Sequence, residues 1–161
     1  IHIVDENICT QLNDIMQQYK TDPTFINLEI TETAAVKYQE ILEENMSSLR
    51  GMGCSFSMDD FGTGYSNISQ IAQVKYDLIK LEKSLLWPYF GEDEPEKAKM
   101  MLESIVELVH KMGVKIVQEG VETKEQFELL KSLGVEYMQG YYFSRPVNET
   151  DYIKFLAEKA V

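Results

Sequence analysis

The chain has 161 residues, 44% hydrophobic and 26% charged, with a net charge of −12. This length fits one globular domain, and so acidic a surface repels polyanions, which argues against a nucleic-acid polymer as partner. No apolar run approaches the roughly 20 residues that span a bilayer, so we expect a cytoplasmic domain, although a longer parent protein with a membrane anchor stays open. Cys9 and Cys54 are expected to be reduced and packed, and the isolated His2 and His110 give little support for a histidine metal site.

Strand-like and helix-like patterns alternate along the whole chain. In chain order we expect a helix at 8–19, a strand at 25–30, a helix at 34–50, a strand at 55–58, a short helix at 66–72, a strand at 76–81, a helix at 96–112, a strand at 114–117, a helix from 123 to 134, a strand at 137–139 and a helix at 148–159. Gly51 and Gly53 should end the second helix. Thr123 with Gln126 forms a capping box, and Asn148 caps the last helix.

Two apolar groups of side chains have a less certain environment. Met100, Met101 and Met112 lie at helical spacing, which favours the core over a surface position. The aromatic stretch at 87–90 is expected to pack under the following helix, while a partner surface is the alternative.

Repeated strand–helix units predict an α/β fold with a parallel sheet or barrel and helices outside it. Five strands are too few for a closed eight-stranded barrel, so either the sheet is open or the first strands are missing. Five strands would also leave two raw edges. We therefore expect further strands from elsewhere, or a homodimer in which two copies cover each other's edges.

Acidic side chains gather where the predicted strands end. The candidate residues at these ends are Glu29, Glu32, Asp59, Asp60, Lys80, Glu82, Glu119, Glu122 and Gln139. Carboxyl ends of parallel strands share one edge, so the carboxylates should converge there and repel each other by about 4 kcal/mol per pair at 4 Å. Bound Mg²⁺, Mn²⁺ or Ca²⁺ would relieve this repulsion, and two ions sharing an aspartate would activate water for attack on phosphorus. The alternative is that some are helix caps or turn residues, in particular Glu32, Glu122 and the Asp59–Asp60 pair.

Four segments carry a more specific signal. They are LEITE at 28–32, DDFGTGYS at 59–66, EGVE at 119–122 and QGYYFSRP at 139–146. Four such motifs in this order resemble the EAL domain family, and the resemblance covers nearly the whole chain. It implies a modified (β/α)₈ TIM barrel that hydrolyses cyclic di-GMP to 5′-pGpG with Mg²⁺ or Mn²⁺, two ions in the intact domain.

The resemblance also implies roles for individual residues. Glu29, Asp59, Asp60 and Glu119 match metal ligands, with Asp59 as the bridge and Glu119 also cast as a general base. Lys80 matches the lysine that holds a catalytic water.

Supporting roles follow from the same motifs. Gln139 matches a glutamine near the site, Glu32 a glutamate that steadies the loop at 61–67, and Glu122 an acid that supports a ligand. Arg145 and Pro146 are weaker candidates for substrate binding, and for Arg145 an ion pair with a nearby carboxylate is an equal alternative.

Departures from the family pattern limit these expectations. The Glu-Ala-Leu motif and the asparagine of the following strand, both metal ligands in the family, belong upstream of Ile1. Residues 1–161 are therefore expected to be the C-terminal part of an EAL domain without its first three strands, inactive alone but part of an active parent that carries a sensory or GGDEF domain. Glu82 stands where the family's Lys-x-Asp motif has Asp. A degenerate EAL domain that binds cyclic di-GMP without cutting it is the alternative.

Overall fold

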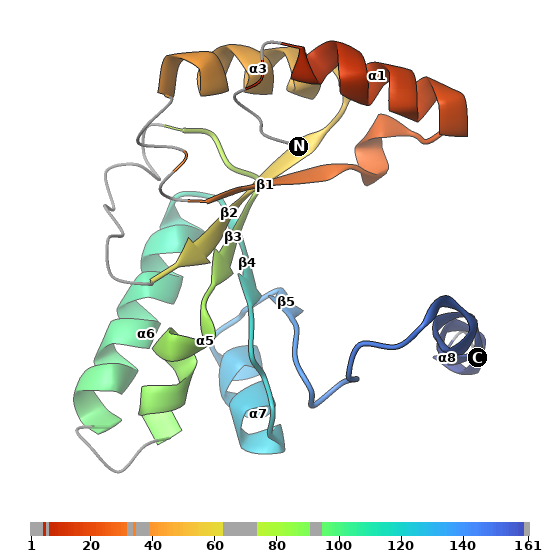
Figure 1. Ribbon diagram of the computed structural model, residues 1–161. Helices are drawn as coiled ribbons and strands as arrows, with labels where there is room; N and C mark the ends of the chain where they lie inside the picture. Colours follow the sequence, from red (N-terminus) through yellow and green to blue (C-terminus); the bar gives the residue numbers. More distant parts are fainter. Residues whose placement is uncertain are drawn as a thin grey trace.

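The computed structural model describes residues 5, 7–31, 34, 39–62, 74–90 and 95–159. Within them, one parallel sheet runs in the order β1-β2-β3-β4-β5 (Figure 1). Its strands are β1 (Asn27–Thr31), β2 (Ser55–Phe61), β3 (Leu78–Leu81), β4 (Lys115–Gln118) and β5 (Tyr137–Met138). The helices are α1 (Ile8–Tyr19), α3 (Gln39–Met52), α5 (Lys83–Leu86), α6 (Pro95–Lys111), α7 (Lys124–Ser132) and α8 (Glu149–Lys159), with 3₁₀ turns η1 (Pro23–Phe25) and η2 (Trp87–Phe90).

The outer face of the sheet forms the core. Alternate strand residues on this face are almost completely buried: Ile30, Phe56, Met58, Ile79, Leu81 and Ile116. They belong to one apolar cluster with Leu42 and Leu49 of α3 and with Leu102, Val106 and Val109 of α6. Burying side chains of this size contributes roughly 1.5–3 kcal/mol each, so this face fixes the positions of the strands.

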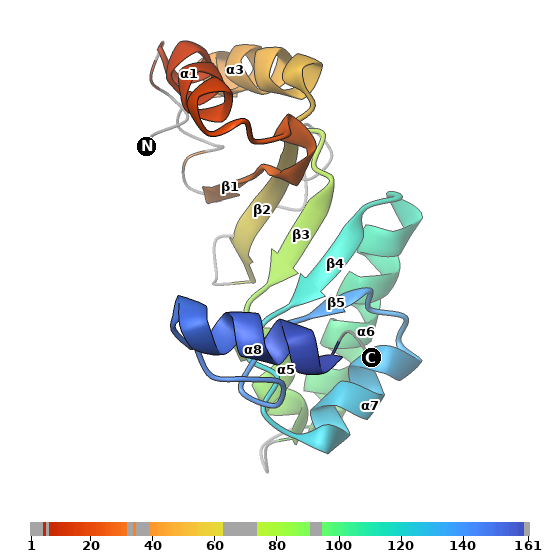
Figure 2. The ribbon, with the colours of Figure 1, turned by 90° about the vertical axis from the view of Figure 1, so that its right-hand side faces the viewer.

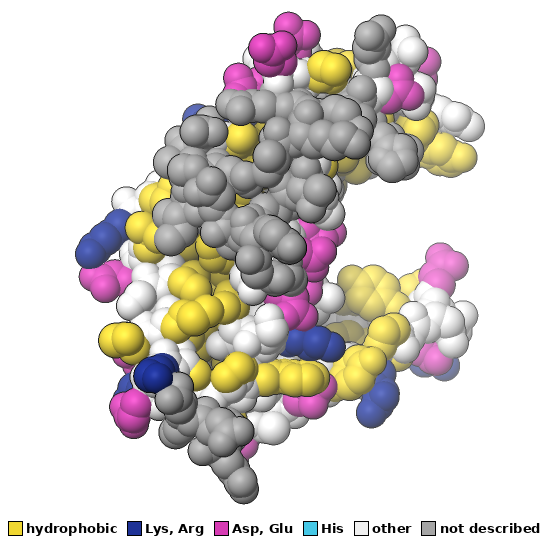
Figure 3. All heavy atoms as spheres, turned by 60° about the vertical axis from the view of Figure 1, so that its left-hand side comes forward, with side chains coloured by type: hydrophobic (Ala, Val, Ile, Leu, Met, Phe, Trp, Pro, Cys, Tyr) yellow, Lys and Arg dark blue, Asp and Glu magenta, His cyan; other side chains and the backbone are white. Residues whose placement is uncertain are grey.

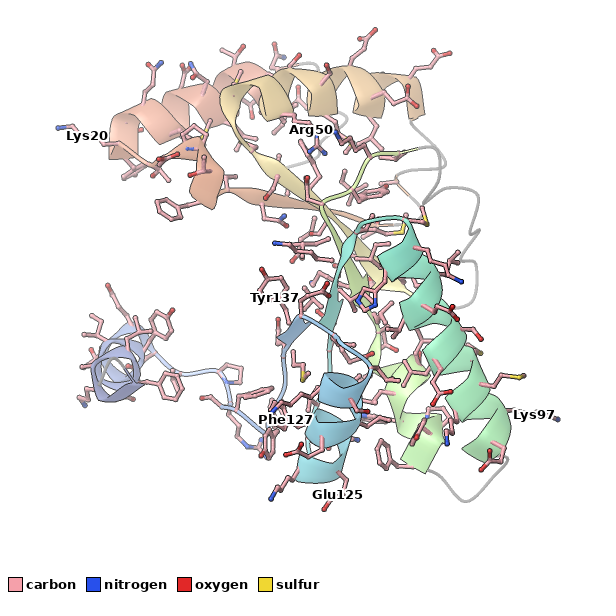
Figure 4. The ribbon with its side chains drawn as sticks, turned by 180° about the vertical axis from the view of Figure 1, so that it is seen from behind. Lys20, Arg50, Lys97, Glu125, Phe127 and Tyr137 are labelled. Atoms are coloured by element: carbon pink, nitrogen blue, oxygen red, sulfur yellow. The ribbon has the colours of Figure 1, made fainter. Side chains whose placement is uncertain are left out.

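The inner face carries the other set of alternate residues and is more polar and more open. On β1 the inner residues Asn27, Glu29 and Thr31 are all exposed. Tyr137 on β5 keeps 48% of its surface exposed and lies on the side of the sheet that looks toward α8 (Figure 4). Period-two alternation therefore separates an apolar outer face from a polar inner one, as in a barrel wall.

The sheet curves as part of a barrel wall, with most of the helices outside it. α1 and α3 lie at one end of the structure and α5, α6 and α7 at the other, while α8 stands apart on the inner side (Figures 1 and 2). A hollow opens between the sheet and α8, and acidic side chains line its wall (Figure 3). The predicted α/β fold with part of a TIM-like barrel is confirmed.

Several predicted boundaries were wrong. β1 begins at Asn27, because Asp22 accepts the N–H of Thr24 and starts a 3₁₀ turn at Pro23. Gly51 stays inside α3, and only Gly53, at φ 111°, ends it. β2 runs on to Phe61, whereas the sequence predicted a loop from that residue.

The core face of α6 also differs from the prediction. Met100 and Met101 are 65% and 52% exposed. The buried side chains are Leu102, Val106 and Val109, whose spacing of four and three residues follows the helix period. Met100 is two positions before Leu102, about 200° around the helix, and therefore faces away from the sheet.

The aromatic stretch is divided between packing and exposure. Trp87 and Phe90 are 41% and 43% exposed, while Tyr89 packs against the core.

The helix caps agree with the sequence. Thr123 and Gln126 form the reciprocal capping box of α7. Asn148 Oδ1 accepts the N–H of Asp151 at 3.0 Å, which caps α8. The predicted helix at 66–72 and Glu32 lie outside the described residues. Among the helices that are described, none is both long and apolar enough to cross a membrane.

Candidate functional site

Lys80 lies at the centre of the acidic strand ends. Its Nζ is 2.8 Å from Asp59 Oδ1, 2.9 Å from Glu29 Oε1 and 3.0 Å from Glu119 Oε1. The three carboxylates come from β1, β2 and the residue after β4, while Lys80 comes from β3 between them. The predicted convergence of Glu29, Asp59, Lys80 and Glu119 on one point is what the structure shows.

The charge of this cluster is unbalanced. Burial of the Lys80 ammonium opposes its charge, but hydrogen bonds to Asp59, Glu29 and Glu119 outweigh burial and raise the pKa of Lys80 above its ordinary value. Lys80 is therefore cationic at neutral pH, and one positive charge faces three negative ones. The two uncompensated negative charges favour a divalent cation nearby.

Asp59 and Asp60 occupy a β-bulge. The pairing steps from Met58 opposite Ile79 to Phe61 opposite Leu81, so β2 holds one residue more than β3 across this interval. Asp60 takes φ 58°, the left-handed region that non-glycine residues avoid at a cost of about 1–3 kcal/mol. In a regular strand, two successive side chains point to opposite faces, and the bulge breaks this alternation at the two aspartates. Strain of this kind is typical of a functional site.

Side chains on the inner face hold β1 against β2. Asn27 Nδ2 donates to Ser55 Oγ at 2.9 Å, and Ser57 Oγ donates to Asn27 Oδ1 at 2.7 Å. Both serines lie on the strand that carries Asp59, and Asn27 lies two residues before Glu29. This link therefore fixes the two carboxylates relative to each other.

Gln118 is a residue that the sequence analysis missed. It is completely buried, and its Nε2 donates to the carbonyl oxygens of Leu81 at 3.1 Å and Glu119 at 3.0 Å, with Glu82 O at 3.4 Å. It thus ties the carboxyl ends of β3 and β4 together directly behind Lys80 and Glu119. A buried amide needs hydrogen-bond partners, but the burial of Gln118 and its partners depend on the neighbouring strand β3, so no signal for it was present in the sequence.

The donor set suits a hard divalent cation. Asp59 Oδ1 is buried and contacts Lys80 Nζ at 2.8 Å, and among the described residues no further donor reaches this oxygen. All the candidate ligands are carboxylates, which suit Mg²⁺ or Mn²⁺ better than zinc. Across the residues described here, however, no three acidic, histidine or cysteine side chains lie close enough to hold an ion unaided. The carboxylates therefore fit the metal chemically, while Lys80 takes the central position.

The remaining predicted residues lie around this cluster rather than in it. Glu82 is the N-cap of α5, where its carboxylate accepts the N–H of Ser84 at 2.6 Å. Glu82, which stands where the family's Lys-x-Asp motif has Asp, therefore has a structural role as a helix cap. Glu122 is exposed, and in the described part of the structure the ion pairs of Lys80 are with Glu29, Asp59 and Glu119 rather than with Glu122.

Gln139, Arg145 and Pro146 line a separate cavity. Its volume is about 350 Å³, and it lies between the loop after β5 and α8, with Tyr141 and Tyr152 among its other walls. The Arg145 guanidinium lies over the Tyr141 ring, 4.4 Å from its centroid, and among the described residues it forms no ion pair with a carboxylate. Such a basic, aromatic cavity can hold a planar base or a phosphate.

A backbone contact joins this cavity to the Glu119 loop. Val121 N donates to Gln139 O at 3.1 Å, and Tyr142 N donates to Val121 O at 3.0 Å. A Cβ at Gly140 would collide with the Val121 backbone, so only glycine permits this approach. The EGVE and QGYY segments are therefore packed into one unit.

Comparison with known proteins agrees with this geometry. The family model described as the EAL domain matches residues 1–146. The cyclic di-GMP phosphodiesterase RocR of Pseudomonas aeruginosa is 31% identical over 148 residues, which are 92% of this chain and 37% of RocR.

Solved structures show the same fold. The PaMucR phosphodiesterase in complex with c-di-GMP matches with a TM-score of 0.84 and 26% identity over 94% of this chain and 60% of that one. Klebsiella pneumoniae BlrP1, in a manganese and cy-diGMP complex, matches with a TM-score of 0.78 and 29% identity over 88% of this chain and 36% of that one. The chain thus spans less than two thirds of each of these proteins. With its motifs, its sheet and its acidic strand ends in agreement, the chain belongs to the EAL domain family.

Proposed function

We propose that this chain is the C-terminal part of a metal-dependent phosphodiesterase that hydrolyses cyclic di-GMP to 5′-pGpG in bacterial signalling. The observation that carries the proposal is the Lys80 ammonium within 2.8–3.0 Å of carboxylates from three separate strand ends. An acidic centre of this kind concentrates cations where a phosphodiester must be cut. The names of RocR and PaMucR support the same reaction.

The proposed ligands are Glu29, Asp59, Asp60 and Glu119, which would hold Mg²⁺ or Mn²⁺ in the intact domain. Bound divalent ions supply an activated water and stabilise negative charge on the phosphoryl oxygens. The manganese in the BlrP1 complex supports a divalent metal, and the carboxylate chemistry supports Mg²⁺ or Mn²⁺.

This chain's own residues orient the water and move its proton. Lys80 Nζ donates a hydrogen bond to the water oxygen, and the Glu119 carboxylate accepts the water proton as this oxygen bonds to phosphorus. The P–O bond to a ribose 3′ oxygen breaks, and this leaving oxygen takes a proton from solvent water. The cavity with Arg145 and Pro146 is proposed to hold a guanine base or a phosphate, while Gln139, Glu122 and Glu32 support the site from its border.

A product assay tests the reaction. The intact parent protein is incubated with cyclic di-GMP and Mn²⁺, and the products are separated by chromatography. We expect 5′-pGpG from the wild type, none from Glu119→Gln, and wild-type amounts from Glu107→Gln, a matched change at an exposed ion pair with Lys111 on α6. Residues 1–161 alone are expected to form little or no product. A wild-type level of product from Glu119→Gln would refute the assignment of the base.

A non-catalytic cyclic di-GMP receptor is the second candidate. The observation that favours it is that Lys80 already occupies the centre of the three carboxylates and compensates one of their charges without metal. Calorimetry separates the two functions. A receptor would bind cyclic di-GMP equally well with Mn²⁺ or with EDTA and release no 5′-pGpG, whereas the enzyme needs Mn²⁺ for product.

The exposed inner face and the two sheet edges bear on assembly. We propose that further strands of a longer, cytoplasmic parent, with a sensory or GGDEF domain and in some cases a membrane anchor, complete the barrel, or that a homodimer covers the edges. Size-exclusion chromatography of residues 1–161 tests this, since a well-behaved compact monomer would contradict it.

A further inference from the structure

An ion pair at the amino end of the sheet, opposite the candidate site, joins three elements. Arg50 lies in the last turn of α3, the helix before β2, and Asp77 directly precedes β3 (Figure 4). Arg50 Nη1 donates to both Asp77 carboxylate oxygens at 2.9 Å, and its Nη2 donates to Lys75 O at 2.6 Å. Asp77 Oδ2 also accepts the N–H of Phe56, the second residue of β2, at 2.9 Å. The pair therefore connects α3, β2 and β3.

The same arrangement recurs two strands along the sheet. His110 lies in the last turn of α6, the helix before β4, and Glu136 directly precedes β5. Glu136 Oε2 is 3.4 Å from His110 Nε2 and accepts the N–H of Ile116, the second residue of β4, at 3.0 Å. We call the Arg50–Asp77 and His110–Glu136 pairs the amino-end clamps. Their matching positions distinguish them from scattered surface ion pairs.

Both clamps have a fixed spacing to the candidate site. The acid of each clamp, and the residue whose N–H it accepts, lie three positions before a predicted site residue. These spacings are Phe56 before Asp59, Asp77 before Lys80, Ile116 before Glu119 and Glu136 before Gln139. Three residues of strand span about 10 Å, so each clamp acts on its site residue through a short, stiff segment. A slip of one residue would turn a side chain to the other face of the sheet, which would take Lys80 away from its three carboxylates.

We propose that Arg50, Asp77, His110 and Glu136 are positioning residues, which hold Asp59, Lys80, Glu119 and Gln139 at the same level along the barrel wall. The inference rests on the site residues of the proposed function but not on the reaction itself. In each clamp, a residue in the helix before the first strand pairs with the acidic residue directly before the second strand. One clamp joins β2 to β3 in this way, and the other joins β4 to β5.

Nuclear magnetic resonance of the isotope-labelled intact parent protein tests this without substrate or added metal. The variants are Asp77→Asn and Glu136→Gln, which remove a charge at nearly constant shape. Val106→Ala is the control, because it trims a buried α6 side chain outside both clamps. Amide hydrogen exchange is read at Phe56 and Ile116, and chemical shifts are read at Asp59, Glu119 and the Lys80 Nζ group.

Each clamp should affect its own strands. Asp77→Asn should speed exchange at Phe56 about tenfold or more beyond the global change and shift the Asp59 and Lys80 signals. Glu136→Gln should do the same at Ile116 and Glu119, while Val106→Ala should leave the site signals in place. Unshifted site signals in both clamp variants would overturn the proposal and leave two ordinary stabilising ion pairs.

A further variant keeps the test decisive if Asp77→Asn fails to fold. Arg50→Lys retains the charge but has one nitrogen instead of two, so it cannot keep the contacts with both Asp77 and Lys75 O in the present geometry. It should still shift the Lys80 signal, and an unchanged signal would again refute the proposal. Loss of phosphodiesterase activity plays no part in these outcomes, so the two proposals fail separately.

Discussion

Replacing Lys80 with Met tests the electrostatics of the candidate site. Each of the three carboxylates has an oxygen within 3.0 Å of Lys80 Nζ, so these oxygens lie within about 6 Å of one another. At an effective dielectric near 20, two charges at this distance repel by about 3 kcal/mol. Glu29 is half-exposed, so solvent screens its part of the repulsion. A net loss of about 2 kcal/mol at pH 7 is the expected result.

A loss of this size lowers the melting temperature of a 161-residue domain by roughly 4–8 °C. Divalent cations should replace the missing ammonium, so Mn²⁺ at millimolar concentration should stabilise Lys80→Met more than the wild type.

The assay is differential scanning fluorimetry with and without Mn²⁺, with Lys111→Met as the control. Lys111 forms a single ion pair and its side chain is 70% exposed, so its loss should change the melting temperature little. The reasoning would be refuted if Lys80→Met melted like the wild type, or if Mn²⁺ stabilised both proteins equally.

Three further predictions concern the surroundings of the site. Gln118→Leu removes a buried amide that holds three carbonyl oxygens, so the free energy of unfolding in urea should fall by about 2 kcal/mol, and an unchanged value would contradict the role given to it. Thr123→Ala removes the capping box with Gln126 and should cost about 1 kcal/mol, measured in the same way. Burial raises the pKa of Glu136, but hydrogen bonds from Ile116 and other groups outweigh it, so the pKa in the folded state is lowered. The stabilisation is therefore complete above the unfolded value of about 4.3 and is lost as the pH falls through the folded value. Glu136→Gln should flatten the acid limb of a stability-against-pH curve, and identical acid limbs would contradict this.

Much of the fold could be predicted from local patterns. The α1 helix, the capping box at Thr123 and the cap at Asn148 each depend on residues adjacent in sequence. The convergence of Glu29, Asp59, Lys80 and Glu119 could also be predicted from the alternating strands and helices. Parallel strands bring their carboxyl ends to one edge of a sheet, whatever the detailed packing.

Other features depend on contacts between distant segments and gave no local signal. Met100 has the hydrophobicity of a core residue, and only the position of α6 against the sheet decides that it is exposed. Neither the bulge at Asp60 nor the hydrogen bonds of Gln118 to the end of β3 can be read from spacing, since each depends on the neighbouring strand. Similarly, nothing in the sequence pairs Asp77 with Arg50 or Glu136 with His110 until the strands are placed side by side.

Anomalous diffraction at the manganese edge, from crystals soaked in Mn²⁺, tests most directly whether the acidic strand ends bind a divalent cation. We predict a peak about 2.0–2.2 Å from carboxylate oxygens of Asp59 and Glu119, with Lys80 Nζ displaced from its present position. Manganese bound only at other surface acids, or an undisturbed Lys80 among its three carboxylates at saturating Mn²⁺, would contradict the account.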